Sequence, residues 1–375
     1  MILHVYSGNL FGGIESNLLA LCAADQARHG QPCHPVALSF EDTLASELRG
    51  LGVPLDILGP VRFRYPWTAW AARRKLVRRL RDPSIAGVVA HGSWAYRLAQ
   101  PAARKSGKPI AFWNHDPFRG EGPLESFAVA HPPDFLVANS RYTAGALEKA
   151  FGRPVDRVIH PVSRHRSAEV PADARSRIRA EFDTPDDAVV ILLFSRFEPL
   201  KGHTILLLSL EKLKGLDGWH VWFVGGLRKP SEIEYQRALR VIAERAGIAD
   251  RVRFVGHRDD IPAILAAADI HCQPNVGPDS FGLTYVEALA AGLPSVGSNL
   301  GGVPEIVTPD CGRLVPPGDP VHLAEVLKEL ITDPALRARL GEKGSERARS
   351  LRDVNAGLRS LESLFEPAPE GGSRA

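Results

Sequence analysis

Short runs of β-branched and aromatic residues alternate along this chain with longer amphipathic stretches, in two series separated by a polar interval. The first series holds the runs at residues 2–6, 36–38, 88–90, 110–113, 135–138 and 157–159. The second series holds the runs at residues 189–194, 220–224, 252–255, 270–273, 295–297 and 313–315. Strands that alternate with helices form parallel sheets covered by helices on both faces. The sequence therefore predicts an α/β protein with two doubly wound, Rossmann-like domains.

The polar interval, residues 161–187, is rich in Arg, Ser, Pro and Asp and predicts the linker between the two domains. The expected domains are residues 1–163 and 164–353, and 375 residues are ample for two cores. Segment 354–366 is amphipathic but comes after the second sheet pattern is complete. The tail at 367–375 has no apolar anchor and is predicted to be disordered.

Composition excludes several classes of protein. No apolar run approaches the roughly 18 residues of a membrane span, and the first residues read as a strand rather than a signal peptide, so we expect a cytoplasmic protein. The net charge of +3 is small and gives no whole-chain case for nucleic acid. The four cysteines form no Cys-x-x-Cys pair, which predicts buried thiols at Cys22, Cys33, Cys272 and Cys311.

The segment 278–294 carries the clearest signal for a binding site. It follows a predicted strand and continues into an apolar helix that contains the acid Glu287. A buried charge must either pair within the fold or meet the hydroxyls of a ligand, and both readings stay open. Asp279 precedes this helix, and the amides at the helix start suit a phosphate. The predicted substrate-binding residues at that start are Ser280, Phe281, Gly282 and Leu283.

Arg196 and Lys201 follow the first strand of the second series, one near the strand end and one near a helix start. A planar guanidinium and a compact ammonium together suit the adjacent oxygens of a diphosphate. Solvated surface cations are the alternative.

Two further signals stand in the first domain. The pair Gly12-Gly13, in the loop after the first strand, allows backbone amides to approach an anion, although a tight turn is the alternative. His115 ends a strand, where a functional residue is expected, and a structural histidine is the alternative. Ser140 is predicted to cap the helix that follows it.

Together these motifs resemble the retaining GT-B glycosyltransferases of family GT4 over nearly the whole chain. The residues that carry the resemblance, in the family's order, are Gly12-Gly13, Asn114-His115-Asp116, Ser140 to Thr143, Arg196 with Lys201-Gly202, Val255-Gly256-His257 ahead of Asp260-Ile261, Asp279 with Glu287, and Gly301 to Val307. The family's fold places two Rossmann-like domains on either side of an interdomain cleft. Its last helix crosses back to the N-terminal domain, which would account for segment 354–366.

The resemblance also implies roles for the site residues. Arg196 and Lys201 would hold the donor diphosphate, Glu287 would bind the nucleotide ribose, and Asp279 would bind hydroxyls of the donor sugar. His115 and the Gly13 amide would meet the donor from the other domain. The chain departs from the family at Asp279, where Glu is usual, and at Ser195, which stands in place of Gly.

The implied reaction moves a hexose from a UDP or GDP sugar to an acceptor hydroxyl with retention. No cofactor is expected, and no metal, because the chain holds no Asp-x-Asp. A carbohydrate, a glycolipid or a small molecule would be the acceptor. A sugar-nucleotide epimerase and a catalytically silent nucleotide-sugar-binding protein are the alternatives. A glycosidase is disfavoured, because its paired carboxylates have no use for phosphate-binding cations.

The segment 62–81 is the one strongly basic stretch, with eight Arg or Lys residues and no acid. A solvated helix is one reading. The other is a surface for an anionic acceptor or for peripheral contact with the inner face of a membrane, with Trp67 and Trp70 at the interface.

Overall fold

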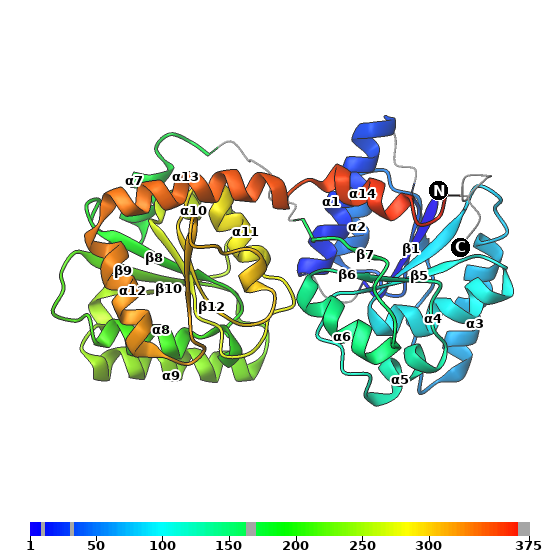
Figure 1. Ribbon diagram of the computed structural model, residues 1–375, viewed down its shortest axis with the longest axis horizontal. Coiled ribbons are helices and arrows are strands. Elements are labelled where there is room, and N and C mark those ends of the chain that lie inside the picture. The colour runs from blue at the N-terminus through cyan, green and yellow to red at the C-terminus, as the bar shows by residue number, and fades with distance from the viewer. Residues whose placement is uncertain (9–11, 31–33, 163–169, 367–375) are drawn as a thin grey trace. The chain divides into compact units, whose positions relative to one another are not determined.

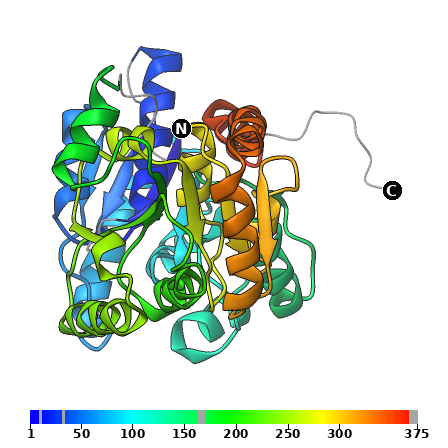
Figure 2. The ribbon, with the colours of Figure 1, turned by 90° about the vertical axis from the view of Figure 1, so that its left-hand side faces the viewer.

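The computed structural model describes residues 1–8, 12–30, 34–162 and 170–366. The chain divides into two compact units, one of residues 1–164 with 353–375 and the other of residues 165–352. Each unit is built on one parallel sheet with helices on both faces, which confirms the predicted α/β class (Figure 1 and Figure 2).

The sheet of the first unit has seven parallel strands in the order β3-β2-β1-β4-β5-β6-β7. Its strands are β1 (Ile2–Tyr6), β2 (Val36–Leu38), β3 (Leu55–Ile57), β4 (Gly87–His91), β5 (Ile110–Asn114), β6 (Phe135–Ala138) and β7 (Arg157–Val158). All but β3 lie where the sequence predicts a strand. β3 escapes prediction because it is a half-buried edge strand of three residues, with Asp56 at its centre.

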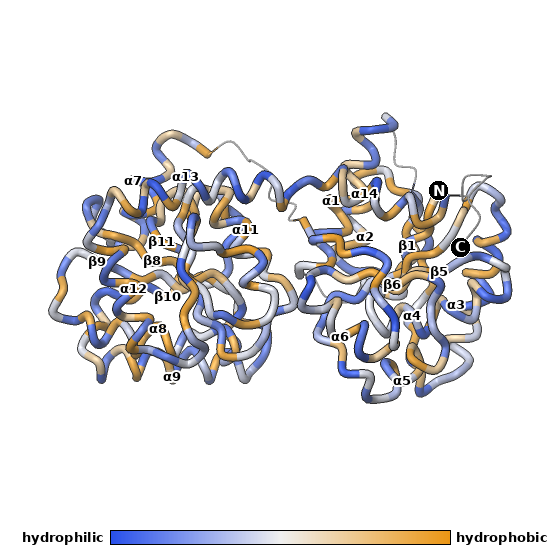
Figure 3. The backbone as a smooth tube through the Cα atoms, in the orientation of Figure 1, coloured by the Kyte–Doolittle hydropathy of each residue, from blue (hydrophilic) through white to orange (hydrophobic). Residues whose placement is uncertain are grey.

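The sheet of the second unit has six parallel strands in the order β10-β9-β8-β11-β12-β13. Its strands are β8 (Val189–Phe194), β9 (Trp219–Val224), β10 (Val252–Gly256), β11 (Ile270–Gln273), β12 (Ser295–Ser298) and β13 (Gly312–Val315). Successive side chains of β8 point to opposite faces of the sheet, so Ile191 and Leu192 belong to two different cores. Both faces are therefore buried, and the central strands are hydrophobic along their length (Figure 3).

Helices cover both faces of each sheet. On one face of the first sheet lie α3 (Pro66–Arg79), α4 (Gly92–Lys105), α5 (Gly122–Ala130) and α6 (Arg141–Phe151). On its other face lie α1 (Gly13–His29), α2 (Thr43–Gly50) and α14 (Val354–Glu362). On one face of the second sheet lie α8 (His203–Glu211), α9 (Pro230–Ala246) and α12 (Pro320–Thr332). On its other face lie α7 (Ala174–Glu181), α10 (Ile261–Ala267) and α11 (Leu283–Ala290), with α13 (Pro334–Leu351) packed along α11.

The end of the chain packs against its beginning. Val354, Leu358 and Leu361 of α14 share a core cluster with Ile2 of β1. The ring of Phe365 lies over Gly87, where a Cβ would come within 2.1 Å of it. The predicted tail at 367–375 lies outside the described residues. Helix α14 is therefore part of the first unit, although it follows the second unit in the chain.

Two predictions about composition can be compared with the fold. Cys22, Cys272 and Cys311 are free and buried, as expected, whereas Cys33 lies outside the described residues. Among the described helices, none has both the length and the apolar character needed to cross a membrane.

Arg179 of α7 is a fully buried cation that ties α7 to the second sheet. Its guanidinium donates to the carbonyl oxygens of Ala267, Pro185, Asp186 and Ala188 at 2.8–3.1 Å. It also pairs with Asp269 at 2.6 Å. Asp269 in turn accepts the N–H of Val190, in β8, at 2.7 Å. A buried charge is tolerated here because all three nitrogens of the guanidinium donate to oxygen atoms.

Replacing Arg179 with Met should destabilise the second unit by about 3–5 kcal/mol, because Asp269 and four carbonyls would lose a buried donor. Arg175→Met is the matched control. Arg175 pairs with the other oxygen of Asp269 at 2.7 Å, but its side chain is 44% exposed, so its loss should cost about 1 kcal/mol or less. Urea unfolding of the two variants measures the difference. Equal effects would show that the buried network is not what holds α7.

Candidate functional site

Strands β8 and β11 are neighbours at the centre of the second sheet, and further strands are added on the outer side of each. β9 and β10 extend it beyond β8, whereas β12 and β13 extend it beyond β11. Loops that leave the carboxyl ends of β8 and β11 therefore turn to opposite faces, and open α/β sheets bind ligands at such a point. Arg196 and Lys201 lie in the loop after β8, and Asp279 lies in the loop after β11.

Lys201 and Asp279 form an ion pair across this point. Nζ of Lys201 lies 2.7 Å from Oδ2 of Asp279, and the two side chains are only 15% and 20% exposed. Nδ2 of Asn275 donates to the same oxygen at 3.5 Å. The fold thus brings together two residues that the sequence separates widely, and it places a cation beside a carboxylate where strand ends collect ligands.

Gly202 explains how the two loops come so close. Its φ is +82°, and a Cβ at this position would lie 1.9 Å from the carbonyl oxygen of Pro274. Only glycine fits both the dihedral and the contact. Gly202 directly follows the short helix η1 (Pro199–Lys201), so it holds Lys201 against the loop after β11.

A second glycine contact supports the loop that carries Asp279. Gly301, after β12, has a φ of +65°, and a Cβ there would lie 2.3 Å from the carbonyl oxygen of Asp279. The N–H of Gly302 donates to that oxygen at 2.9 Å. In the sequence, these glycines are recognisable only as part of the family resemblance. Each of these glycines follows a strand end, and that position could have indicated that they support the site loops.

Arg196 is placed differently from Lys201. Nη1 of Arg196 lies 2.7 Å from Oε1 of Glu198, and the Arg196 side chain is 56% exposed. Pairs with one exposed partner contribute little to stability. In this structure, therefore, the two cations predicted to share a diphosphate each have a carboxylate partner of their own.

At the start of helix α11, backbone groups rather than side chains are available to bind a ligand. Gly282 precedes the helix with a φ of +110°. The side chain of Phe281 is 1% exposed and packs with Tyr285 in a core cluster, so Phe281 can meet a ligand only through its backbone. Ser280 and Leu283 are half-buried. The first amides of α11 are thus the groups that remain suited to an anion.

Glu287 lies on α11, one turn beyond Leu283. It is half-buried rather than fully buried, although its neighbours Val286 and Ala288 are in the core. The apolar pattern around Glu287 therefore places it on a helix at the margin of the core.

In the first unit, the backbone at Gly12, directly before the first residue of α1, is held by a buried acid. Glu15 is 2% exposed, and its Oε2 accepts the N–H of Gly12 at 2.8 Å. Its Oε1 accepts the hydroxyl of Tyr6 at 2.6 Å. Gly12 and Gly13 themselves are exposed. Sequence reasoning missed Glu15, and the signal was an acid at the third helical position after a glycine pair.

His115 follows β5 and is 3% exposed. Its Nε2 lies 3.0 Å from Nδ1 of His91, and its carbonyl oxygen accepts Nδ2 of Asn139 at 3.0 Å. Burial lowers the pKa of His115 to about 3, so the ring is neutral at physiological pH.

Ser140 caps α6 as predicted, with its Oγ accepting the N–H of Thr143 at 3.1 Å.

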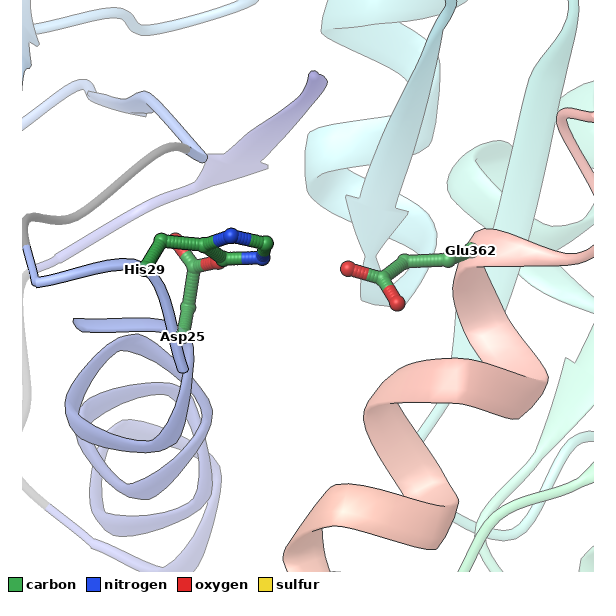
Figure 4. Close-up of side chains that lie close together, drawn as sticks. All are labelled: Asp25, His29 and Glu362. Carbon is green, nitrogen blue, oxygen red and sulfur yellow. The ribbon is translucent and has the colours of Figure 1, made fainter. Parts of the chain in front are cut away.

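One group of side chains in the described part of the chain has ligand atoms close enough together for a metal ion. Asp25 and His29 of α1 lie near Glu362 of α14, as Figure 4 shows. Oε2 of Glu362 pairs with Arg28 at 2.9 Å and Oε1 accepts Nε2 of His34 at 3.1 Å, so a cation would compete with both. The contacts join α14 to the carboxyl end of α1, at the opposite edge of the sheet from the Gly12-Gly13 loop.

Two family models match the chain. The model described as Glycosyltransferase Family 4 matches residues 11–162, and the one described as Glycosyl transferases group 1 matches residues 174–347. Each match falls within one of the two compact units.

Relatives and solved structures agree with these matches. A D-inositol 3-phosphate glycosyltransferase of Streptomyces avermitilis is 34% identical over 60% of this chain, and the match spans only half of that relative's length. A phosphatidyl-myo-inositol mannosyltransferase of Mycobacterium leprae is 27% identical over 98% of this chain and 96% of its own. The structure of Anabaena HepE with UDP and glucose has a TM-score of 0.81 at 23% identity, covering 97% of this chain and 98% of the other.

The structural likeness confirms the GT-B fold that the sequence predicts. Both halves of the chain match family models of the same kind of enzyme, one in each unit and in the expected order. The chain belongs to the GT4-type glycosyltransferases.

Proposed function

We propose that this chain transfers a hexose from a nucleoside-diphosphate sugar to an acceptor hydroxyl, with retention at the anomeric carbon and without a metal ion. The observation that carries the proposal is the pair of Lys201 and Asp279, 2.7 Å apart at the carboxyl ends of β8 and β11. A cation beside a carboxylate suits the two ends of a sugar nucleotide, its diphosphate and its sugar hydroxyls.

Stabilisation of the leaving group is the main task of the second unit. As the bond from the anomeric carbon to the diphosphate breaks, negative charge gathers on the phosphate oxygens. Lys201 and Arg196 meet that charge with their side chains, and the first amides of α11 meet it with their N–H groups. Each cation exchanges its present carboxylate for phosphate, which releases Asp279 to accept hydrogen bonds from sugar hydroxyls. Glu287 binds the ribose.

Retention follows when the acceptor attacks from the face that the diphosphate leaves. The acceptor oxygen bonds to the anomeric carbon, and a phosphate oxygen of the departing diphosphate takes its proton. A separate carboxylate base is then unnecessary. The amide of Gly13 and the neutral ring of His115 contact the donor from the first unit in this proposal.

Donor and acceptor are proposed from what the relatives' names state. The Anabaena protein was solved with UDP-glucose, and relatives are named for D-inositol 3-phosphate and for phosphatidyl-myo-inositol. We therefore propose a nucleotide-sugar donor and a carbohydrate, polyol or glycolipid acceptor for this chain.

Acceptor dependence separates this proposal from its alternatives. An epimerase would convert the donor without any acceptor, and a silent binding protein would bind it without turnover. A thermal-shift panel of UDP, GDP and ADP with their sugars identifies the nucleotide first, because a ligand at 100 times its Kd adds about 2.7 kcal/mol. The bound donor is then incubated with and without candidate acceptors.

Activity should persist in excess EDTA. The charge of Lys201 and Arg196 takes the place that a divalent cation would fill on the diphosphate. Product formation is measured before and after chelation. A complete loss that Mg²⁺ or Mn²⁺ restores would contradict metal independence while leaving sugar transfer intact.

Replacing Lys201 with Ala should lower turnover about 100-fold or more, the scale of losing one donor to developing charge. Because the lost cation is one of the two proposed to hold the diphosphate, affinity for the nucleoside diphosphate should also fall. Lys212→Ala is the matched control, because Lys212 is an exposed lysine just beyond the far end of α8. Near-normal turnover of Lys201→Ala would remove Lys201 from the site.

Helix α3 offers a surface for an anionic membrane. It buries Ala69, Ala72 and Leu76, while Trp67 and Trp70 are 66% and 59% exposed. Arg73, Lys75 and Arg79, three of the basic residues expected there, instead bind groups of the first unit. The outward stripe that remains is Trp67, Trp70, Arg74 and Arg78.

The chain should therefore float with anionic vesicles at low salt and less so at high salt. The double variant Trp67→Ala and Trp70→Ala should float less, since both indoles would otherwise enter the interface. Flotation with neutral vesicles is the control. No enrichment on anionic vesicles at low salt would leave α3 as a solvated helix.

A further inference from the structure

Three buried histidines form a continuous hydrogen-bonded row in the first unit. They are His4 of β1, His91 at the end of β4, and His115 just after β5. Nδ1 of His4 lies 2.9 Å from Nε2 of His91, and Nδ1 of His91 lies 3.0 Å from Nε2 of His115. None of the three side chains is more than 3% exposed. The proposed reaction uses only the last of them.

The three histidines form a row because of the register in which their strands pair. β1, β4 and β5 are adjacent, and side chains two residues apart on a strand share a face. Neighbouring rings are tilted by only 24° and 12°, which suits hydrogen bonds made in the ring plane. Trp113 lies beside both His91 and His115, with ring centroids 5.3 and 5.2 Å away. The imidazoles are thus fixed in orientation by packing as well as by hydrogen bonds.

All three rings are neutral. Burial lowers the pKa of each well below its usual range, and the neighbouring imidazoles lower the pKa of His4 and His91 further. A neutral imidazole carries one ring proton, so one nitrogen donates and the other accepts. His91 is bonded through both nitrogens and must therefore donate to one neighbour and accept from the other.

This requirement couples the tautomers of the row. If His91 carries its proton on Nε2, it donates to His4 and accepts from His115, so all three rings carry Nε2–H. If His91 carries it on Nδ1, all three rings carry Nδ1–H. His34 does not continue the row, because its Nδ1 accepts the N–H of Ile2 at 3.1 Å and its Nε2 contacts Glu362. The second nitrogen of His115 is then fixed as either an acceptor or a donor.

We propose that His91 is a positioning residue that holds His115 in one tautomer and one ring orientation toward the sugar nucleotide. The Nε2–H form is the intrinsically favoured tautomer of a neutral histidine, so Nδ1 of His115 is the acceptor offered to a hydroxyl of the donor. This inference rests on the proposed function, in which His115 contacts the donor. His4 completes the row by giving His91 its second partner.

The tautomers are read directly by ¹⁵N NMR of the full chain labelled at histidine, with signals assigned from single variants. The expected result is one common tautomer, Nε2–H, for His4, His91 and His115. In His91→Phe, which cannot hydrogen-bond, the His115 signals should become those of a tautomer mixture. Different tautomers within the native row, or an unchanged His115 in His91→Phe, would overturn the proposal. This readout does not depend on activity, so it fails independently of the proposed sugar transfer.

Turnover supplies the second measurement. His91→Phe should lower kcat roughly 100-fold, the scale for a misplaced positioning group, while affinity for the nucleoside diphosphate stays within about threefold. His91→Asn keeps a polar group near the Nδ1 position and should recover at least about tenfold of that loss. His131→Gln replaces an exposed histidine outside the row and should not change kcat. Equal losses in His91→Phe and His91→Asn, in step with their melting temperatures, would indicate a merely structural histidine.

Discussion

Parallel strand pairing is the constraint on which both units depend. Each strand of a parallel sheet must be followed by a crossover, so every strand has its carboxyl end at the same edge of its sheet. In the second unit the sheet grows away from β8 on one side and from β11 on the other, and the two loops at that point carry Lys201 and Asp279. The site is thus a consequence of strand order before any side chain is considered.

Both units bury polar side chains, and hydrogen bonds or ion pairs satisfy the ones that build the sites. The second unit keeps charges and pairs them, as Lys201 does with Asp279 and Arg179 does with Asp269. The Arg179 guanidinium is fully buried and serves stability, whereas the Lys201 pair stays partly exposed, as the proposed exchange with a ligand requires. In the first unit, three buried neutral imidazoles bond to one another, and their hydrogen bonds carry direction without a desolvated charge.

Glycines set the precision of these arrangements. Gly202 lets the loop after β8 approach that after β11, and Gly301 lets the turn after β12 press on the backbone of Asp279. In the first unit Glu15 holds Gly12, because its buried carboxylate accepts both the N–H of Gly12 and the Tyr6 hydroxyl. At each of these glycines, a close contact with a neighbouring residue fixes where the backbone lies.

The sequence by itself determined the strands, their grouping into two units and most residues at the strand ends, because hydrophobic periodicity reports burial locally. It did not predict β3, a half-buried edge strand of three residues with an acid at its centre, which gives no such signal. Only the tertiary structure decided that Lys201 pairs with Asp279 and that His4 and His91 form a hydrogen-bonded row with His115. Each of these contacts depends on which strands become neighbours and in what register, and that information is spread over the whole chain rather than held in any one segment.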